Sequence, residues 1–296
     1  MPIAANLISM FLFAGYAIIP TYLHLSPILI IWFFALGGFL SLLPVAIFKV
    51  KLRDLIDLDI LVISSIMVLD VFFLLEGYSM LSVGIVTSLH YFGPVIATLV
   101  APIMLKQKFN KKIFLFVVLS FLGTLIMLLK FNGSFNYVII EGLFFGFMSG
   151  ITLAGDIIFQ NKYMKKNKKK HNNSLINAMT TVFKYNFYIL LILTVPVLIM
   201  LHTTYVPNYP EILGVGVIIQ GVSMVLVNYS SVTLPVNYVG LFGYTEILWS
   251  FVYGYFLLHQ HVSIFELIGG AMIVAAAYVG YLEKRRESYA VRSDLP

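Results

Sequence analysis

The stretch that decides the fold is residues 83–112, which read VGIVTSLHYFGPVIATLVAPIMLKQKFNKK. Residues 83–105 are mostly apolar, and four lysines follow between 106 and 112. An apolar run of about 20 residues is long enough to cross the hydrocarbon core of a bilayer as a helix. Basic residues are enriched in the connections on the cytoplasmic side. This stretch therefore predicts a membrane helix whose C-terminal end lies inside the cell.

The same pattern runs through the whole chain of 296 residues, which is 60% hydrophobic, only 11% charged, and has a mean hydropathy of +0.95. An ordinary soluble domain has about 25% charged residues, so this composition excludes soluble, secreted and disordered proteins. Ten apolar runs are long enough to span a membrane: 3–23, 27–48, 58–79, 83–105, 112–130, 137–160, 175–201, 211–231, 236–258 and 262–283. We therefore predict an all-α integral membrane protein with ten transmembrane helices.

The basic residues predict the orientation of these helices. With the N-terminus in the cytoplasm, every second connection and the C-terminal tail are cytoplasmic, and only Lys130 and Lys184 among the 19 basic residues fall elsewhere. The basic cluster at 162–170 fits topology and contact with anionic lipid headgroups, so we expect no nucleic-acid partner. The expected partners are a small-molecule substrate and membrane lipids. The expected location is the bacterial cytoplasmic (inner) membrane, with both termini inside.

An internal repeat appears when the chain is shifted by 152 or 153 residues. Residues 91–95 (YFGPV) then meet residues 244–248 (YTEIL), and residues 106–108 (KQK) meet residues 259–261 (HQH). Each half, 1–134 and 135–296, holds five predicted spans, so the second half enters the membrane from the opposite side. Inverted repeats of this kind place a cavity near the midplane that opens alternately to either side. The sequence thus predicts transporter architecture.

This arrangement resembles the drug/metabolite transporter superfamily, specifically its EamA-like ten-helix branch. The residues that carry the resemblance are Gly93 and Pro94, Glu246 and Ile247, and the glycines Gly123, Gly269, Gly270 and Gly280. The sequence departs from the family pattern at the two turns, where Gln107 and Gln260 replace a usual glutamate. A position in the second helix of each half is commonly basic in the family; here it is Trp32 in the first half and Lys184 in the second. The resemblance implies secondary transport of a small metabolite, since similar proteins carry amino acids, quaternary amines such as choline, or S-adenosylmethionine.

Charged residues inside the spans are the first candidates for a binding site, because each costs at least about 2.5 kcal/mol at the bilayer centre. Glu246 is the principal candidate, and we expect it to hold an ammonium group of the substrate or the coupling proton. The alternative role for Glu246 is structural, as a protonated carboxylic acid. Asp70 is a second candidate for proton coupling, with a structural role equally open. Asp156 and Lys184 share a depth and are expected to pair, either as a structural ion pair or as a binding charge or gate.

Aromatic residues are the second set of candidates. Trp32, Tyr91, Tyr244 and Trp249 lie at depths that allow them to line one cavity, since their rings attract cations. The alternative is a belt at the membrane interface, which suits Tyr16, Tyr22, Tyr205 and Tyr281 better. Gly142, Gly146, Gly150 and Ala154 form a small-residue ridge that allows close helix packing, within the chain or in a homodimer.

The sequence lacks the motifs that are typical of other classes of protein. The sequence has no HExxH zinc motif, no nucleophile elbow and no cysteine, so we predict that the protein is not an enzyme and needs no cofactor or metal. His259 and His261 alone give an incomplete metal shell. No nucleotide-binding motif is present, so a gradient or exchange must supply energy. The predicted function is export of an amino acid or amine by proton antiport or exchange; the alternative is an uptake permease or exchanger for a metabolite such as S-adenosylmethionine or choline.

Overall fold

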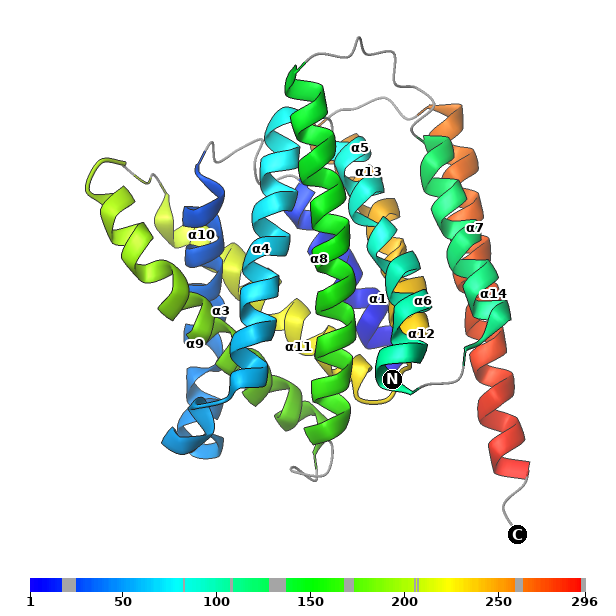
Figure 1. Ribbon diagram of the computed structural model, residues 1–296, viewed down its shortest axis with the longest axis horizontal. Helices are drawn as coiled ribbons and strands as arrows, with labels where there is room; N and C mark the ends of the chain where they lie inside the picture. The colour runs from blue at the N-terminus through cyan, green and yellow to red at the C-terminus, as the bar shows by residue number, and fades with distance from the viewer. Residues whose placement is uncertain are drawn as a thin grey trace.

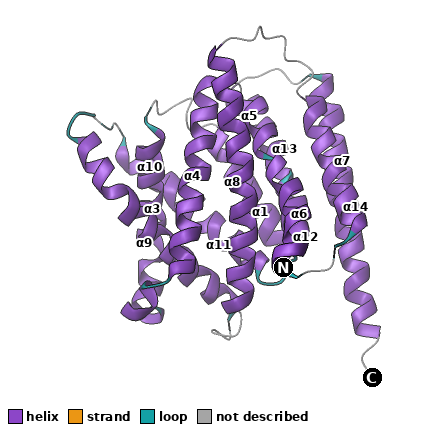
Figure 2. Cartoon of the chain, viewed as in Figure 1, coloured by secondary structure: helices purple, strands orange, loops and turns teal. Residues whose placement is uncertain are grey.

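A computed structural model describes residues 1–17, 25–81, 83–106, 109–127, 137–167, 173–204, 206, 208–258 and 263–293. The regular elements of these residues are all helical (Figure 2). They are α1 (Pro2–Phe13), η1 (Ala14–Ala17), α3 (Pro27–Lys49), η2 (Leu52–Leu55), α4 (Leu58–Met80), α5 (Val83–His90), α6 (Phe92–Leu105), α7 (Lys111–Met127), α8 (Tyr137–Asn167), α9 (Ser174–Leu201), α10 (Tyr209–Gly216), η4 (Val217–Ser223), α11 (Met224–Ser231), α12 (Val236–Gly243), α13 (Thr245–Leu258) and α14 (Ile264–Ser293). The predicted all-α class is confirmed.

Each of the ten predicted apolar runs contains helix. Within the described ranges, six helical segments are long and apolar enough to cross a membrane: 27–49, 58–80, 86–105, 137–167, 174–201 and 209–231. The fourth run is divided into α5 and α6 at Tyr91, and the ninth into α12 and α13 at Tyr244. The eighth run contains a stretch of π-helix, η4, between α10 and α11. The residues of the two predicted turns, 107–108 and 259–261, lie outside the described ranges.

Two helices extend further than their apolar runs predict. α8 continues from residue 160 to Asn167, and α14 continues past residue 283 to Ser293. The added turns are rich in lysine and arginine, which have good helix propensity. In α8 the last turn carries Lys165 and Lys166, which the negative end of the helix dipole also stabilises. The apolar period therefore identifies the membrane segment, whereas helix propensity decides where each helix stops.

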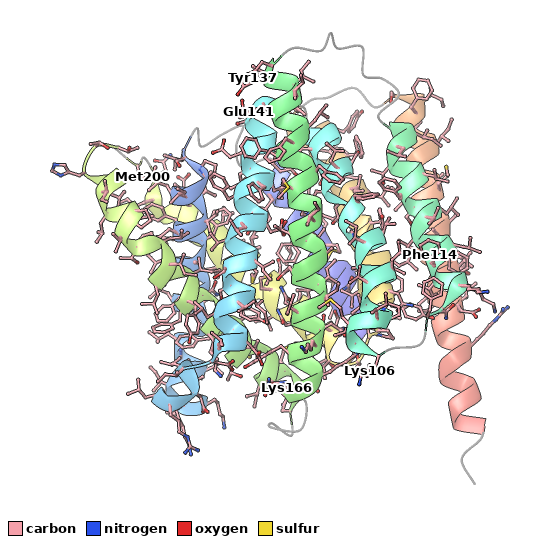
Figure 3. All side chains as sticks on the ribbon, viewed as in Figure 1. Lys106, Phe114, Tyr137, Glu141, Lys166 and Met200 are labelled. Atoms are coloured by element: carbon pink, nitrogen blue, oxygen red, sulfur yellow. The ribbon has the colours of Figure 1, made fainter. Side chains whose placement is uncertain are left out.

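Basic residues lie at one end of the helix bundle, which is called the basic end below. Lys106 and Lys166 lie at the lower end of the view, whereas Tyr137, Glu141 and Met200 lie at the upper end (Figure 3). The N-terminus and the C-terminal end of α14 lie toward the lower end (Figure 1). The enrichment of basic residues on the cytoplasmic side supports assigning the lower end to the cytoplasm. The cytoplasmic location of the termini stays a prediction.

Helices of the two halves pack in matched pairs. The most extensive contacts join α4 to α8, α7 to α14, and α3 to α9. The predicted repeat makes α3 equivalent to α9 and α7 equivalent to α14, and the latter pair stands side by side in Figure 1. Likewise α4 packs on α8 and α1 packs on α11, as a two-fold relation between halves requires. The packing agrees with an inverted repeat, which stays a prediction.

The small-residue ridge of α8 is used inside the chain. A Cβ added to Gly150 would lie 2.6 Å from the carbonyl oxygen of Leu89, and one added to Gly146 would lie 2.9 Å from a side-chain carbon of the same leucine. Similarly, a Cβ on Gly93 would lie 2.7 Å from the oxygen of Gly150. These glycines therefore let α5 and α6 approach α8 closely, at the point where the chain breaks beside the cavity.

Candidate functional site

A cavity of about 120 Å³ lies inside the helix bundle. Its wall comes from both predicted halves: α1 and η1, α4, the α5–α6 break, α8, the η4–α11 segment, and α12 with α13. Most of the lining side chains are apolar, and several are methionine or aromatic. The ionisable lining groups include the carboxyls of Asp70, Asp156 and Glu246 and the imidazole of His90. Among the described lining residues there is no lysine or arginine, so the charge of the cavity is negative whenever these acids are ionised.

Two of the acids lie deep in their helical segments. At about 1.5 Å per residue, Asp70 and Glu246 lie roughly 15–18 Å from the first residues of α4 and α12 at the basic end of the bundle. Half the hydrocarbon thickness of a bilayer is about 15 Å. These two acids are therefore near the midplane, where an unneeded charge is costly and where inverted-repeat transporters hold their substrates.

Glu246 is held by a tyrosine from the other half of the chain. The hydroxyl of Tyr91 donates to Glu246 Oε2 at 2.7 Å, and the hydroxyl of Tyr244 donates to the main-chain oxygen of Tyr91 at 2.8 Å. Both tyrosines stand at the breaks of their helices, which leaves the Tyr91 carbonyl available to a side-chain donor. The structure thus brings the predicted residues Tyr91, Tyr244 and Glu246 together. Tyr244 acts through Tyr91 and does not itself line the cavity.

Asp156 lines the cavity beside amide groups. Its two carboxyl oxygens each accept from the side-chain nitrogen of Gln160 at 2.6 Å, one turn further along α8. Across the cavity the hydroxyl of Tyr16 donates to Gln220 Oε1 at 3.2 Å. Tyr16 is only 7% exposed, so its predicted place in an interface belt is wrong. The apolar run around Tyr16 gave no sign that this part of the first helix turns inward.

Asp70 lies in a separate polar group. The hydroxyl of Thr152 lies 3.0 Å from Asp70 Oδ1 and can donate to it, and His90 Nδ1 lies 3.7 Å from the same oxygen. His90 Nδ1 is also 3.3 Å from the hydroxyl oxygen of Ser149. Sequence reasoning named Asp70 but not His90, because His90 appeared to lie nearer the outer end of its helix. The break at residue 91 lets it face the cavity instead.

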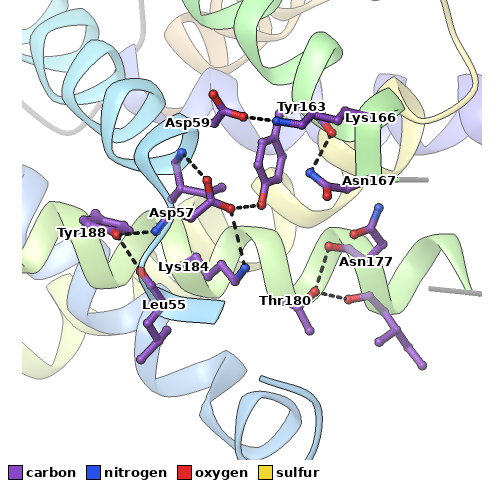
Figure 4. Close-up of polar contacts among 12 residues, drawn as sticks. Leu55, Asp57, Asp59, Tyr163, Lys166, Asn167, Asn177, Thr180, Lys184 and Tyr188 are labelled. Carbon is purple, nitrogen blue, oxygen red and sulfur yellow. Dashed lines mark hydrogen bonds and ion pairs between the residues drawn. The ribbon is translucent and has the colours of Figure 1, made fainter. Parts of the chain in front are cut away.

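The predicted pair between Asp156 and Lys184 does not form in the described part of the chain. Lys184 Nζ lies 4.0 Å from Asp57 Oδ2, and the same Asp57 oxygen accepts from the hydroxyl of Tyr163 at 2.7 Å (Figure 4). The main-chain nitrogen of Asp57 donates to the hydroxyl of Tyr188 at 3.0 Å. Lys184 lies beside Asp57 at the start of α4, whereas Asp156 lines the cavity, and α8 packs chiefly on α4 whereas α9 packs chiefly on α3. Lys184 therefore belongs to a polar cluster near the basic end, outside the cavity.

The two tryptophans also lie outside the cavity. Trp32 Nε1 donates to the hydroxyl of Thr194 at 3.1 Å, which ties α3 to α9. Trp249 is 36% exposed and packs edge-on against Phe11, with ring centroids 5.0 Å apart. Trp249 follows Glu246 by three residues, yet it borders an apolar groove on the outside of the bundle with residues of α1, α13 and α14. The helical spacing from Glu246 allows Trp249 to face either the cavity or the outside of the bundle, and the packing of α13 against its neighbours turns it outward.

Comparisons with known proteins agree with this architecture. Residues 1–129 match the sequence model of the EamA-like transporter family. An uncharacterized transporter of Archaeoglobus fulgidus is 25% identical over 246 residues, which cover 83% of each chain. A crystal structure of a protein 12% identical in sequence covers 96% of this chain and 97% of that chain with a TM-score of 0.78, which shows a shared fold alone. Together with the multi-pass helical fold, these findings confirm the resemblance seen in the sequence: residues 1–129 are similar to the EamA-like transporter family, and the long apolar helices are those of an integral membrane protein.

Proposed function

We propose that the protein is a secondary active transporter that exports a small cationic or zwitterionic metabolite, of the amino acid or amine type, across the cytoplasmic membrane. The observation that carries this proposal is the enclosure of Asp70, Asp156 and Glu246 in one cavity whose described lining residues include no lysine or arginine. Acids near the bilayer centre are costly unless they are neutralised. An ammonium group of the substrate or a proton provides that neutralisation.

The form of the cavity supports binding of an amine that also carries apolar groups. Glu246 and Asp156 each keep a hydrogen-bonded neighbour that fixes the carboxyl in place. The rings of Phe13, Tyr16 and Tyr91 stand around the same space, and aromatic faces attract cations. A volume of about 120 Å³ suits a metabolite of amino-acid size. The proposal involves no covalent chemistry, cofactor or nucleic acid.

Alternating access is supported by the origin of the cavity wall. The halves proposed as repeats, 1–134 and 135–296, both contribute lining residues, and the bond between Tyr91 and Glu246 crosses from one half to the other. Rocking of one half against the other would open this space to either side in turn.

The test is transport by purified protein in liposomes. Radiolabelled lysine, choline and S-adenosylmethionine serve as positively charged or zwitterionic probes, and aspartate serves as the anionic probe. We expect saturable, protein-dependent exchange of at least one of the first three and none of aspartate. Transport of aspartate alone, or no transport above protein-free liposomes, would overturn the proposal. Two conditions in the same liposomes separate the mechanisms. Proton antiport moves the probe in response to a pH gradient, whereas exchange requires unlabelled probe on the opposite side of the membrane.

A further inference from the structure

One carboxyl oxygen of Asp70 lines the cavity without a hydrogen bond from the described residues. The residue is 7% exposed and lines the cavity, and its Oδ1 is met by Thr152 at 3.0 Å and His90 at 3.7 Å. Its Oδ2 accepts no hydrogen bond from the residues that the structure describes. A carboxylate near the bilayer centre is costly as an anion, and a proton on its unbonded oxygen neutralises it. The cavity gives water, and therefore protons, a route to this atom.

The Nδ1 side of His90 is held by a hydroxyl group. The hydroxyl of Ser149 donates to the main-chain oxygen of Gly146 at 2.8 Å, so its oxygen is left to accept from His90 Nδ1. A hydrogen on Nδ1 leaves Nε2 as the basic nitrogen of a neutral imidazole. The Nδ1 side of His90 is therefore directed at Ser149 and Asp70.

The helix break at Tyr91 connects Asp70 and His90 to Glu246, the carboxylate proposed to bind the substrate. His90 is the last residue of α5, and Tyr91 stands between α5 and α6. Tyr91 contacts Glu246 at 2.7 Å, whereas its neighbour His90 contacts the Asp70 group. Two consecutive residues thus reach two different acids. A movement of the break that frees Glu246 from Tyr91 also changes the position of His90 beside Asp70.

We propose that Asp70, with His90 beside it, binds the coupling proton, whereas Glu246 binds the substrate cation. This inference rests on the proposed function. A proton from water on one side adds to an Asp70 oxygen, is carried through the conformational change, and returns to water on the other side; no bond of the substrate is made or broken. The other titratable groups that interact electrostatically with Asp70 include Asp156 on α8, Glu246 on α13, Tyr16 on η1 and Tyr78 on α4. Protonation of Asp70 lowers the negative charge of the cavity, and so favours release of the cation from Glu246.

The experiment compares Asp70→Asn with wild type in two liposome assays that use the lysine, choline and S-adenosylmethionine probes. Exchange of labelled for unlabelled probe needs no proton, and we expect Asp70→Asn to retain it within about tenfold of the wild-type rate. Accumulation driven by one unit of pH gradient reaches about tenfold for one-for-one exchange. In Asp70→Asn we expect this accumulation to fall to unity. The control Glu76→Gln removes an acid of the same helix outside the cavity lining and keeps both activities.

Loss of exchange together with accumulation would place Asp70 in the substrate site and overturn the division of roles. Retention of both would show that Asp70 carries no coupling proton. Failure of wild type to exchange any probe refutes the proposed function instead. A second measurement then still decides the proton site: the infrared difference spectrum of purified protein on acidification. We expect a protonated-carboxyl band that Asp70→Asn removes and Glu76→Gln retains, and an unchanged spectrum in Asp70→Asn would overturn the inference.

Discussion

Replacing Glu246 with glutamine removes one negative charge from the cavity with almost no change of shape. The glutamine amide oxygen can still accept from the hydroxyl of Tyr91, which now lies 2.7 Å from Glu246 Oε2, so the bond between the two halves is retained. Two unit charges about 4 Å apart attract by about 4 kcal/mol at an effective dielectric constant of about 20. Since 1.4 kcal/mol corresponds to a factor of ten, we expect Glu246→Gln to weaken binding of a cationic probe about 10³-fold.

The assay is equilibrium binding of the labelled amine to purified protein in detergent, with thermal unfolding measured on the same samples. Glu141→Gln is the matched control, because it removes an acid at the far end of α8, outside the cavity lining (Figure 3). We expect this control to bind as wild type does. A loss of less than about tenfold in Glu246→Gln, in a protein that unfolds at the wild-type temperature, would refute Glu246 as the partner of the substrate charge.

Two further predictions test the packing that surrounds the site. In a double-mutant cycle on the free energy of unfolding, Lys184→Met and Asp57→Asn should show coupling of about 0.5–3 kcal/mol, because the two groups lie 4.0 Å apart. Lys184→Met and Asp156→Asn should be additive. Coupling in the second pair and additivity in the first would restore the pair predicted from sequence. Gly150→Ala should destabilise the protein by about 1–3 kcal/mol, since its new Cβ would lie 2.6 Å from a main-chain oxygen, while Gly214→Ala, with no atom within 4 Å of the added Cβ, should not; equal melting temperatures for the two variants would contradict this close contact.

The sequence predicts the membrane spans well because hydrophobicity is a property of each segment on its own. The ten apolar runs, and the acids within them, are visible without knowledge of the fold. Asp70, Asp156 and Glu246 were all found in this way, and all three line the cavity. Their cost in hydrocarbon is what makes them informative, since an acid at that depth needs a cavity or a partner.

The direction in which each helix turns depends on its neighbours, and a single sequence does not contain that information. Trp249 lies three residues after Glu246 and faces the outside, while Tyr16 faces inward from a run that resembles an ordinary membrane helix. Lys184 meets Asp57, which caps the start of α4, and not Asp156. His90 reaches the cavity because the helix breaks after it. Polar residues just before a helix break therefore deserve inclusion among candidates, even when they lie near the end of an apolar run.

The central claim is that one cavity, shared by both halves, opens to each side of the membrane in turn. The natural chain has no cysteine, so Leu153→Cys places a single thiol in the cavity wall. Its labelling by a membrane-impermeant thiol reagent is measured in right-side-out and inside-out vesicles, with and without an amine probe. The account predicts labelling from both sides, with the two rates shifting in opposite directions when the probe is added. Labelling from only one side under every condition would contradict it.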